Sequence, residues 1–295
     1  MDGVLVIDKP AGPTSHDVVA RARRALREKR IGHTGTLDPM ATGVLPLVMG
    51  RATRLASLLS STDKTYEAGV RLGSATDTYD AAERLAAGEA PPDAPALDPA
   101  EIEEALARFR GTFPQMPPPY SAKKVGGVRA YKLARKQQPT ALTAVQVTVR
   151  ELTLLGVEDG LVRLRVTGTA GFYVRSLAHD LGLALGCGAH LESLRRTRAG
   201  TFGLDRAVLL DDLDRGPDEL LLRLIPLTDL LPDLPTARLT PRGAQRASHG
   251  NSVSPEDFFV VGRGPLVRLL DPGGCLLGIA EAGPDGLLRP SIVLV

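Results

Sequence analysis

Apolar residues in this chain recur with two periods, one typical of strands and one typical of helices, and the two kinds of segment are mixed along its length. Strand-like runs cover residues 4–7, 44–48, 64–72, 145–149 and 162–166. Helix-like runs cover residues 14–26, 51–61, 98–109 and 174–185. Because strands and helices do not alternate strictly, the pattern favours an α+β domain over a doubly wound one. We expect a mixed, mostly antiparallel sheet with flanking helices.

The segment from Gly32 to Leu47 has no helical or strand period before Gly43. It contains Asp38-Pro39, and the proline disfavours a helical conformation at the aspartate. Its three glycines permit a positive φ or the close approach of another backbone. The residues alone leave two interpretations open, namely an ordinary surface turn with a capping aspartate and a loop that presents polar groups to a ligand.

The net charge of +2 says little about nucleic acids, but its distribution is uneven. Basic side chains gather in residues 21–30, 123–136 and 195–206, and acidic ones in 77–104 and 211–219. Such segregation is typical of a protein with one basic face for a phosphate backbone. A solvated helix face explains any single basic run equally well.

Several classes of protein lack support in this sequence. No apolar run approaches the length of a membrane span, and the N-terminus lacks the pattern of a signal peptide. Cys187 and Cys275 have no metal-ligand or redox spacing, and the histidines form no H-x-x-x-H pair. We therefore expect a cytoplasmic protein that needs no metal.

The chain changes character near residues 230–235, where leucine and proline alternate as in a linker. A short helix is predicted near residues 241–248. Strand-like runs follow at 258–261, 266–270, 275–281 and 287–294. We predict a first domain over residues 1–233 and a small β-rich module over 234–295.

Seven motifs, taken together and in order, resemble one known family. Gly32 to Leu45 closely resembles the catalytic motif of TruB-type tRNA pseudouridine synthases. Further stretches similar to that family lie at residues 8–15, 63–66, 76–78, 119–124, 171–175 and 186–196. The resemblance is strong over about residues 3–210. Residues 235–295 are similar, more weakly, to the PUA-type module of the family.

This resemblance implies the pseudouridine synthase fold with a PUA-like barrel, and an activity. The expected reaction is isomerisation of uridine to pseudouridine in the T loop of tRNA, at the position usually numbered 55. No cofactor or metal is implied. Asp38 matches the catalytic aspartate, as nucleophile or base. Whether it attacks C1′, adds to the base or removes the C2′ proton stays open.

Other positions take their expected roles from the same resemblance. The target uridine must leave the stack to be reached, and His33 matches the histidine that fills the vacated space. Tyr66 matches a tyrosine that packs on the flipped base and takes part in proton transfer, although a buried core tyrosine explains its pattern too. Arg175 matches the arginine that pairs with the catalytic carboxylate and holds it ionised.

Three further positions are substrate-binding candidates. Tyr173 and Leu194 align with residues that line the uracil pocket. Lys9 is expected to contact phosphate or support the loop, and a solvated lysine at a strand end is the alternative. One departure follows Thr76-Asp77-Thr78, where the family usually has Asp-x-x-Gly but Asp80 here precedes Ala81-Ala82-Glu83.

The expected partner is the T-arm stem-loop of tRNA, over which an insertion at about residues 120–140 closes. No membrane and no obligatory protein partner are implied, and we expect a monomer. Two alternatives stay open. One is a tRNA-folding chaperone activity, alone or beside catalysis. The other is a synthase that acts on another RNA within a guide complex.

Overall fold

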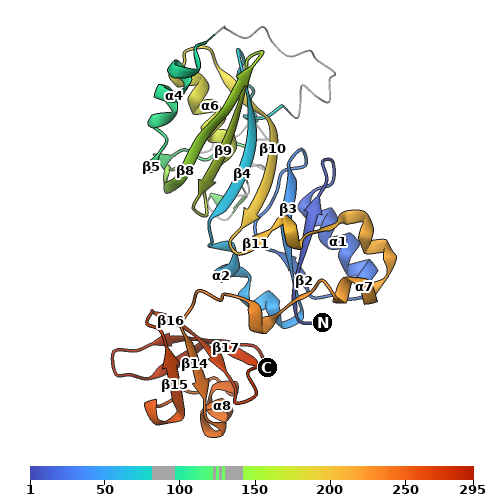
Figure 1. Ribbon diagram of the computed structural model, residues 1–295, viewed down its shortest axis with the longest axis vertical. Coiled ribbons are helices and arrows are strands. Elements are labelled where there is room, and N and C mark those ends of the chain that lie inside the picture. Colours follow the sequence, from blue (N-terminus) through green and yellow to red (C-terminus); the bar gives the residue numbers. More distant parts are fainter. Residues whose placement is uncertain (82–96, 122–123, 126–127, 130–141) are drawn as a thin grey trace.

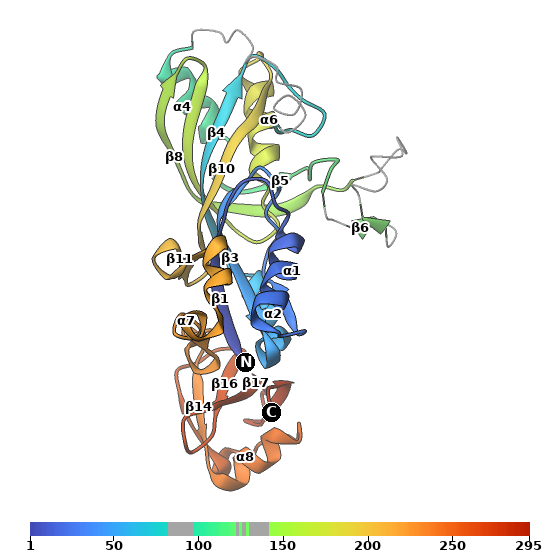
Figure 2. The same ribbon diagram turned by 90° about the vertical axis from the view of Figure 1, so that its right-hand side faces the viewer.

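The computed structural model describes residues 1–81, 97–121, 124–125, 128–129 and 142–295. The molecule is elongated, with a large sheet above and a smaller β module that holds the C-terminus below (Figures 1 and 2). The predicted insertion falls mostly outside the described residues, and so do residues 82–96. Within the insertion, only the short hairpin of β6 (Lys124–Val125) and β7 (Val128–Arg129) is described.

An eleven-stranded sheet forms the body, with the path β12-β1-β3-β10-β4-β9-β8-β5 and with β11, β13 and β2 attached to it. Its pairings are antiparallel except for β1 with β12 and β3 with β10. The α+β class and the mostly antiparallel sheet are therefore confirmed. The strands are β1 (Gly3–Lys9), β2 (Ile31–His33), β3 (Thr42–Met49), β4 (Lys64–Leu72), β5 (Gly111–Gln115), β8 (Val145–Glu158), β9 (Leu161–Gly168), β10 (Ala189–Ala199), β11 (Phe202–Gly203), β12 (Val208–Leu209) and β13 (Ile225–Pro226).

Helices of the body begin where the sequence predicts. In α1 (Ser15–Leu26), Thr14 and Asp17 form a complete capping box. In α4 (Pro99–Ala107), Asp98 and Glu101 do the same. Along α6 (Val174–Ala184) the predicted apolar positions are buried, and α4 and α6 cover one face of the sheet (Figure 1). No helix of the described ranges is both long and apolar enough to span a bilayer.

Two helix predictions need correction. The segment predicted as one helix over 51–61 is a 3₁₀ helix, η1 (Gly50–Leu55), followed by a short α2 (Ala56–Ser60). Neither has a side-chain N-cap, and the Thr53 hydroxyl donates to the Gly50 carbonyl at 2.6 Å, which favours the tighter turn. Helix α4 ends before Phe109, which packs edge-on against Phe113 of β5.

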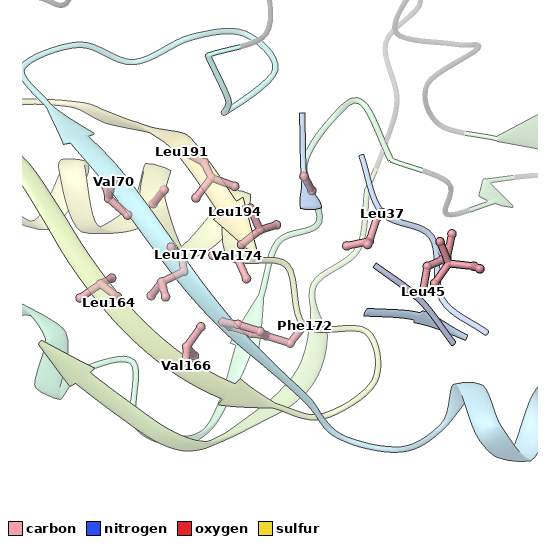
Figure 3. Close-up of a cluster of buried hydrophobic side chains, with 14 of the residues drawn as sticks. Leu37, Leu45, Val70, Leu164, Val166, Phe172, Val174, Leu177, Leu191 and Leu194 are labelled. Carbon is pink, nitrogen blue, oxygen red and sulfur yellow. The ribbon is translucent and has the colours of Figure 1, made fainter. Parts of the chain in front are cut away.

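The main hydrophobic core joins the loop that carries Asp38 to the sheet (Figure 3). Leu37, the neighbour of Asp38, is only 3% exposed and belongs to this core. On the other side of the core lie Phe172 and Leu177, at the start of α6, and Leu194 of β10. The apolar neighbours of Asp38 and Arg175 are thus parts of one packed unit, which restricts how those two side chains can move.

The C-terminal module is a five-stranded sheet with the path β15-β14-β16-β17-β18. Strand β14 was not predicted, because its alternation of polar and apolar residues covers only four positions. A second apolar cluster joins the module to the body, with Val4 and Leu55 on one side and Ile279 and Leu294 on the other. The elements are β14 (Thr236–Leu239), α8 (Pro241–Ser248), β15 (Phe258–Val261), β16 (Leu266–Leu270), β17 (Leu276–Ala282) and β18 (Leu288–Val293). The body also contains η2 (Leu204–Arg206), η3 (Leu210–Arg215) and α7 (Pro217–Leu221), and η4 (Leu227–Asp229) follows β13 in the connection to the module.

Candidate active site

Asp38 lies in the irregular loop between β2 and β3, and a buried lysine holds the backbone of that loop. The Nζ of Lys9 donates to the carbonyls of Pro10, Pro39 and Ala41 at 2.8, 3.1 and 2.7 Å. An ammonium has three N–H groups, so all of its donors are used. Lys9 is 0% exposed and has no surface for a phosphate or for solvent. Of the roles expected for Lys9, its contacts match loop support, and its assignment as a substrate-binding residue is corrected.

The turn that follows β1 holds the same loop from a second direction. The Ser15 hydroxyl accepts from the Leu37 amide at 2.8 Å and donates to the Leu37 carbonyl at 3.0 Å. The amide of Gly12 donates to the Pro39 carbonyl at 2.9 Å. The motif at residues 8–15 therefore satisfies backbone groups of the loop that carries Asp38, as an irregular segment requires.

Arg175 faces Asp38 with two of its nitrogens. The distances are 3.0 Å from Nε to Oδ2 and 3.2 Å from Nη2 to Oδ1, a two-point geometry that fixes both groups. The third nitrogen, Nη1, donates to the Thr78 carbonyl at 3.2 Å and lies 3.6 Å from Oδ2 of Asp80. The guanidinium is thus shared by two carboxylates and a carbonyl, and its side chain is only 7% exposed.

The electrostatic environment of Asp38 differs from the simple expectation that Arg175 keeps it ionised. Burial raises the pKa of Asp38 above its usual value, and the nearby carboxylate of Asp80 raises that pKa further. The charges of Arg175 and Lys9 oppose the rise without cancelling it. The side chain of Asp38 is still 32% exposed, so the carboxylate is reachable from one side.

That open side is a cavity of about 260 Å³. Asp38 and Arg175 line it, and so do three of the predicted binding residues, Tyr66, Tyr173 and Leu194. The structure therefore brings together five of the seven candidates around one space. The other lining residues include Gly35, Thr36, Leu37, Ser60, Lys64, Thr169, Ala170, Gly171, Phe172, Val174 and Arg196.

The remaining two candidates, His33 and Lys9, are not among the lining residues of the cavity. His33 ends β2, where it pairs with Leu47 of β3. Burial, with Arg196 and His16 nearby, lowers the pKa of His33, which favours a neutral imidazole. Lys9 lies beneath the loop, as described above.

Gln115 was missed in the sequence, although it fixes the start of α6. Its side-chain amide donates to the Tyr173 carbonyl at 3.0 Å, and its side-chain oxygen accepts from the Tyr173 amide at 2.8 Å. Tyr173 is the N-cap position, two residues before Arg175, and Gln115 is 1% exposed. A glutamine at a strand end carries no local signal for this contact.

Two arginines of the basic run at residues 195–206 bond within the fold. Arg196 is 1% exposed and donates to the carbonyls of Val44 and Gly35 at 2.7 and 3.0 Å. Arg195 forms an ion pair with Asp8 at 2.7 Å. Charge density in the sequence does not distinguish cations that are used inside the fold from those that face solvent.

One of the residues that line the cavity is a lysine with a lowered pKa. Lys64 is nearly buried and donates to the Ser60 and Thr62 carbonyls. Burial and the neighbouring Arg196 lower the pKa of Lys64 to about 8. Burial raises the pKa of the Tyr173 phenol above its usual value, since burial disfavours the charged form of either group.

Comparison with known proteins accounts for this arrangement. Residues 23–174 match the TruB family pseudouridylate synthase (N terminal domain). The chain belongs to this family. Residues 175–227 match the tRNA pseudouridylate synthase B C-terminal domain, and residues 235–294 match the C-terminal domain of Pseudouridine synthase II TruB. Pseudouridine synthases are isomerases, and as a TruB family member this chain is an enzyme of that class.

Relatives of the TruB family cover the whole chain. The tRNA pseudouridine synthase B of Solibacter usitatus is 45% identical over 100% of both chains. That of Thermobifida fusca is 43% identical over 99% of this chain and 98% of its own. Among solved structures, a Cbf5–Nop10–Gar1 complex contains a chain with a TM-score of 0.78 and 28% identity, over 99% of this chain and 85% of that one.

Proposed function

We propose that this enzyme isomerises uridine 55 in the T loop of tRNA to pseudouridine, without a cofactor. The observation that carries the proposal is the two-point contact between Asp38 and Arg175 at the edge of a cavity lined by Tyr66, Tyr173 and Leu194. The tRNA pseudouridine synthase B relatives, at 42–45% identity, support tRNA as the substrate.

The reaction explains the choice of residues. The bond between N1 and C1′ breaks, a bond between C5 and C1′ forms, N1 gains a proton, and the C5 proton passes to water. Asp38 supplies the nucleophile or base for this exchange. Because burial raises its pKa, its carboxylate is a stronger base than that of a surface aspartate. Arg175 orients it.

The uridine reaches Asp38 by leaving the RNA stack, at a cost of a few kcal/mol. Tyr66 packs on the flipped base and takes part in proton transfer. Tyr173 and Leu194 close the pocket around the base. His33 occupies the space left in the loop, where an aromatic ring recovers about 1–3 kcal/mol of stacking. In this proposal Lys9 acts only through the loop that it supports.

In this proposal the two parts of the chain have different roles. Residues 1–233 carry catalysis, and the module at 234–295 adds RNA-binding surface. The family's insertion at about 120–140 closes over the T loop. We propose that the enzyme acts as a monomer in the cytoplasm and needs no partner protein.

The decisive experiment incubates the full chain with a tRNA transcript that carries tritium at C5 of its uridines. We expect tritium release to water and a pseudouridine mapped at position 55. A transcript with cytidine at that position is the matched control and should release none. No release from the first transcript would overturn the proposal.

Two further arms separate the alternatives. The Asp38→Asn variant should bind tRNA as the wild type does and release no tritium, whereas substantial turnover would remove Asp38 from the chemistry. An isolated T-arm stem-loop should be a substrate. Failure on the stem-loop would favour a synthase that depends on a guide complex.

A further inference from the structure

Two aromatic side chains beside the active site form a stack that the proposed chemistry does not use. The rings of Tyr79 and His179 lie face to face, with centroids 3.8 Å apart and planes 6° from parallel. Tyr79 follows β4 in the segment of residues 76–81, and His179 is in α6. Neither ring is among the described lining residues of the cavity.

His179 and Arg175 are four residues apart on α6, so their side chains lie on one face of the helix. That face holds three consecutive residues of the 76–81 segment. Arg175 contacts the Thr78 carbonyl and the Asp80 carboxylate, as described above, and His179 stacks on the ring of Tyr79 between them. The same segment therefore contacts α6 through the stack and through the guanidinium that faces Asp38.

The backbone of Tyr79 is strained. Its φ is +63°, in the left-handed region that a bulky residue rarely adopts. Such a conformation persists where the surroundings specify it, and it is common near active sites. The Leu191 amide donates to the Tyr79 carbonyl at 3.0 Å, and the Ala81 amide donates to the Leu191 carbonyl at 2.9 Å. These bonds fix the main chain against β10, and the stack fixes the side chain against α6.

We propose that the Tyr79–His179 stack is a clasp that positions the catalytic pair. It holds residues 76–81 in place, so that the Thr78 carbonyl and the Asp80 carboxylate contact Nη1 of Arg175. Arg175 then offers its other two nitrogens to Asp38. Tyr79 and His179 are positioning residues. The inference rests on the proposed function for its catalytic readout, but its structural readout is independent of activity.

The expected effect of losing the clasp is on turnover and not on binding. If residues 76–81 relax, Arg175 shifts and its two-point contact with Asp38 is misaligned. A misplacement of about 1 Å costs up to about 100-fold in rate. Because neither ring lines the cavity, we expect kcat to fall about 10-fold to 100-fold and KM for tRNA to stay unchanged.

The test compares variants that remove the stack with variants that keep an aromatic ring. Tyr79→Leu and His179→Leu should lower kcat, and combining them should add little, since either one abolishes the same contact. Tyr79→Phe and His179→Phe should keep near-wild-type kcat. Leucine carries the same strain as tyrosine at a φ of +63°, so the comparison isolates the ring.

Two controls locate the effect. In an Asp80→Ala background, Tyr79→Leu should lower kcat less, because one of the two contacts between the segment and Arg175 is already removed and only the Thr78 carbonyl remains. Amide hydrogen exchange at Leu191 and Ala81 should accelerate in the leucine variants and not in the phenylalanine variants. This exchange measurement reports on the clasp even if the wild type releases no tritium, a result that would overturn the proposed function alone.

Three outcomes would overturn the clasp. One is a raised KM with unchanged kcat, which would mean that Tyr79 contacts RNA directly. Another is an unchanged kcat in both leucine variants at a temperature where they are folded. The third is unchanged exchange at Leu191 and Ala81. If the leucine variants do not fold, a loss of kcat in Tyr79→Phe and His179→Phe at unchanged exchange would also contradict the proposal.

Discussion

Gly43, the second residue of β3, lies against the backbone of Arg196. A Cβ added to Gly43 would be 2.2 Å from the Arg196 carbonyl oxygen and 2.9 Å from its amide nitrogen. The two residues are register partners where β3 runs parallel to β10. Of the loop's three glycines, Gly43 therefore serves the approach of a second protein strand, and Gly32 has no positive φ.

Gly43→Ala should destabilise the body of the enzyme by about 2–4 kcal/mol, since the backbone of β10 cannot move away as a flexible side chain can. Urea unfolding measures the change. Gly12→Ala is the matched control, because Gly12 has a similar φ, +106° against +99°, and nothing within 4 Å of its added Cβ. Its cost should be only the φ strain, about 1–2 kcal/mol. Equal losses of stability in Gly43→Ala and Gly12→Ala would show that the overlap with Arg196 is relieved at no cost.

Gln115→Leu should lower both stability and turnover. The variant leaves the Tyr173 amide without its partner, at about 1–3 kcal/mol for a buried unsatisfied group, whereas the Tyr173 carbonyl keeps its hydrogen bond from the Leu177 amide. Because Tyr173 begins α6, Arg175 would shift too, and kcat should fall about tenfold. Thr112→Val, at an exposed position of the same strand, should change neither. Wild-type kcat in Gln115→Leu would show that the start of α6 is held by other contacts.

The burial of Lys9 should make the stability of the enzyme depend on pH. Burial lowers the pKa of Lys9 to about 8, below its ordinary 10.5. Between these two values the unfolded chain binds more protons than the folded one, so this group makes the free energy of unfolding rise with pH. The limiting slope is about 1.4 kcal/mol per pH unit.

The measurement is the difference in unfolding free energy between wild type and Lys9→Met, from urea titrations at pH 7 to 10. Other titrating groups, including Lys64, are common to both proteins and cancel. Above pH 8 we expect the unfolding free energy of the wild type to rise relative to that of Lys9→Met. A difference that is constant across this range would mean that Lys9 keeps an ordinary pKa in the folded enzyme.

Asp38→Asn, which we expect to be inactive, should unfold at a higher urea concentration than the wild type at pH 7, because burial raises the pKa of Asp38. An acid whose folded-state pKa is raised favours folding in its neutral form, and that stability is lost as pH rises through the folded pKa. Asparagine keeps the neutral form at pH 7.

Asp17→Asn is a control for which we expect a change in stability of the opposite sign. Its hydrogen bonds with Thr14 lower the pKa of Asp17, so its ionised form stabilises the enzyme at neutral pH. This variant should unfold at a lower urea concentration than the wild type. Destabilisation of Asp38→Asn as well would show that the ion pair with Arg175 outweighs burial.

Local chemistry in the sequence was sufficient for most of the elements. The capping boxes of α1 and α4, the alternation of β4 and the bounds of α8 follow from side chains within a few residues of one another, whose effects do not depend on the rest of the fold. The irregular loop around Asp38 was also visible. Its meaning came from resemblance to a family, because the residues alone were equally consistent with a surface turn.

Only the tertiary structure decided how that loop is held and charged. Lys9, Gln115 and Arg196 look like ordinary surface residues in the sequence, yet each is buried. Their hydrogen bonds reach residues 32, 58 and 161 positions away along the chain, respectively. Asp38 and Arg175 meet across 137 residues. Burial and long-range pairing set the pKa and orientation of the Asp38 carboxylate, and neither is encoded in local spacing.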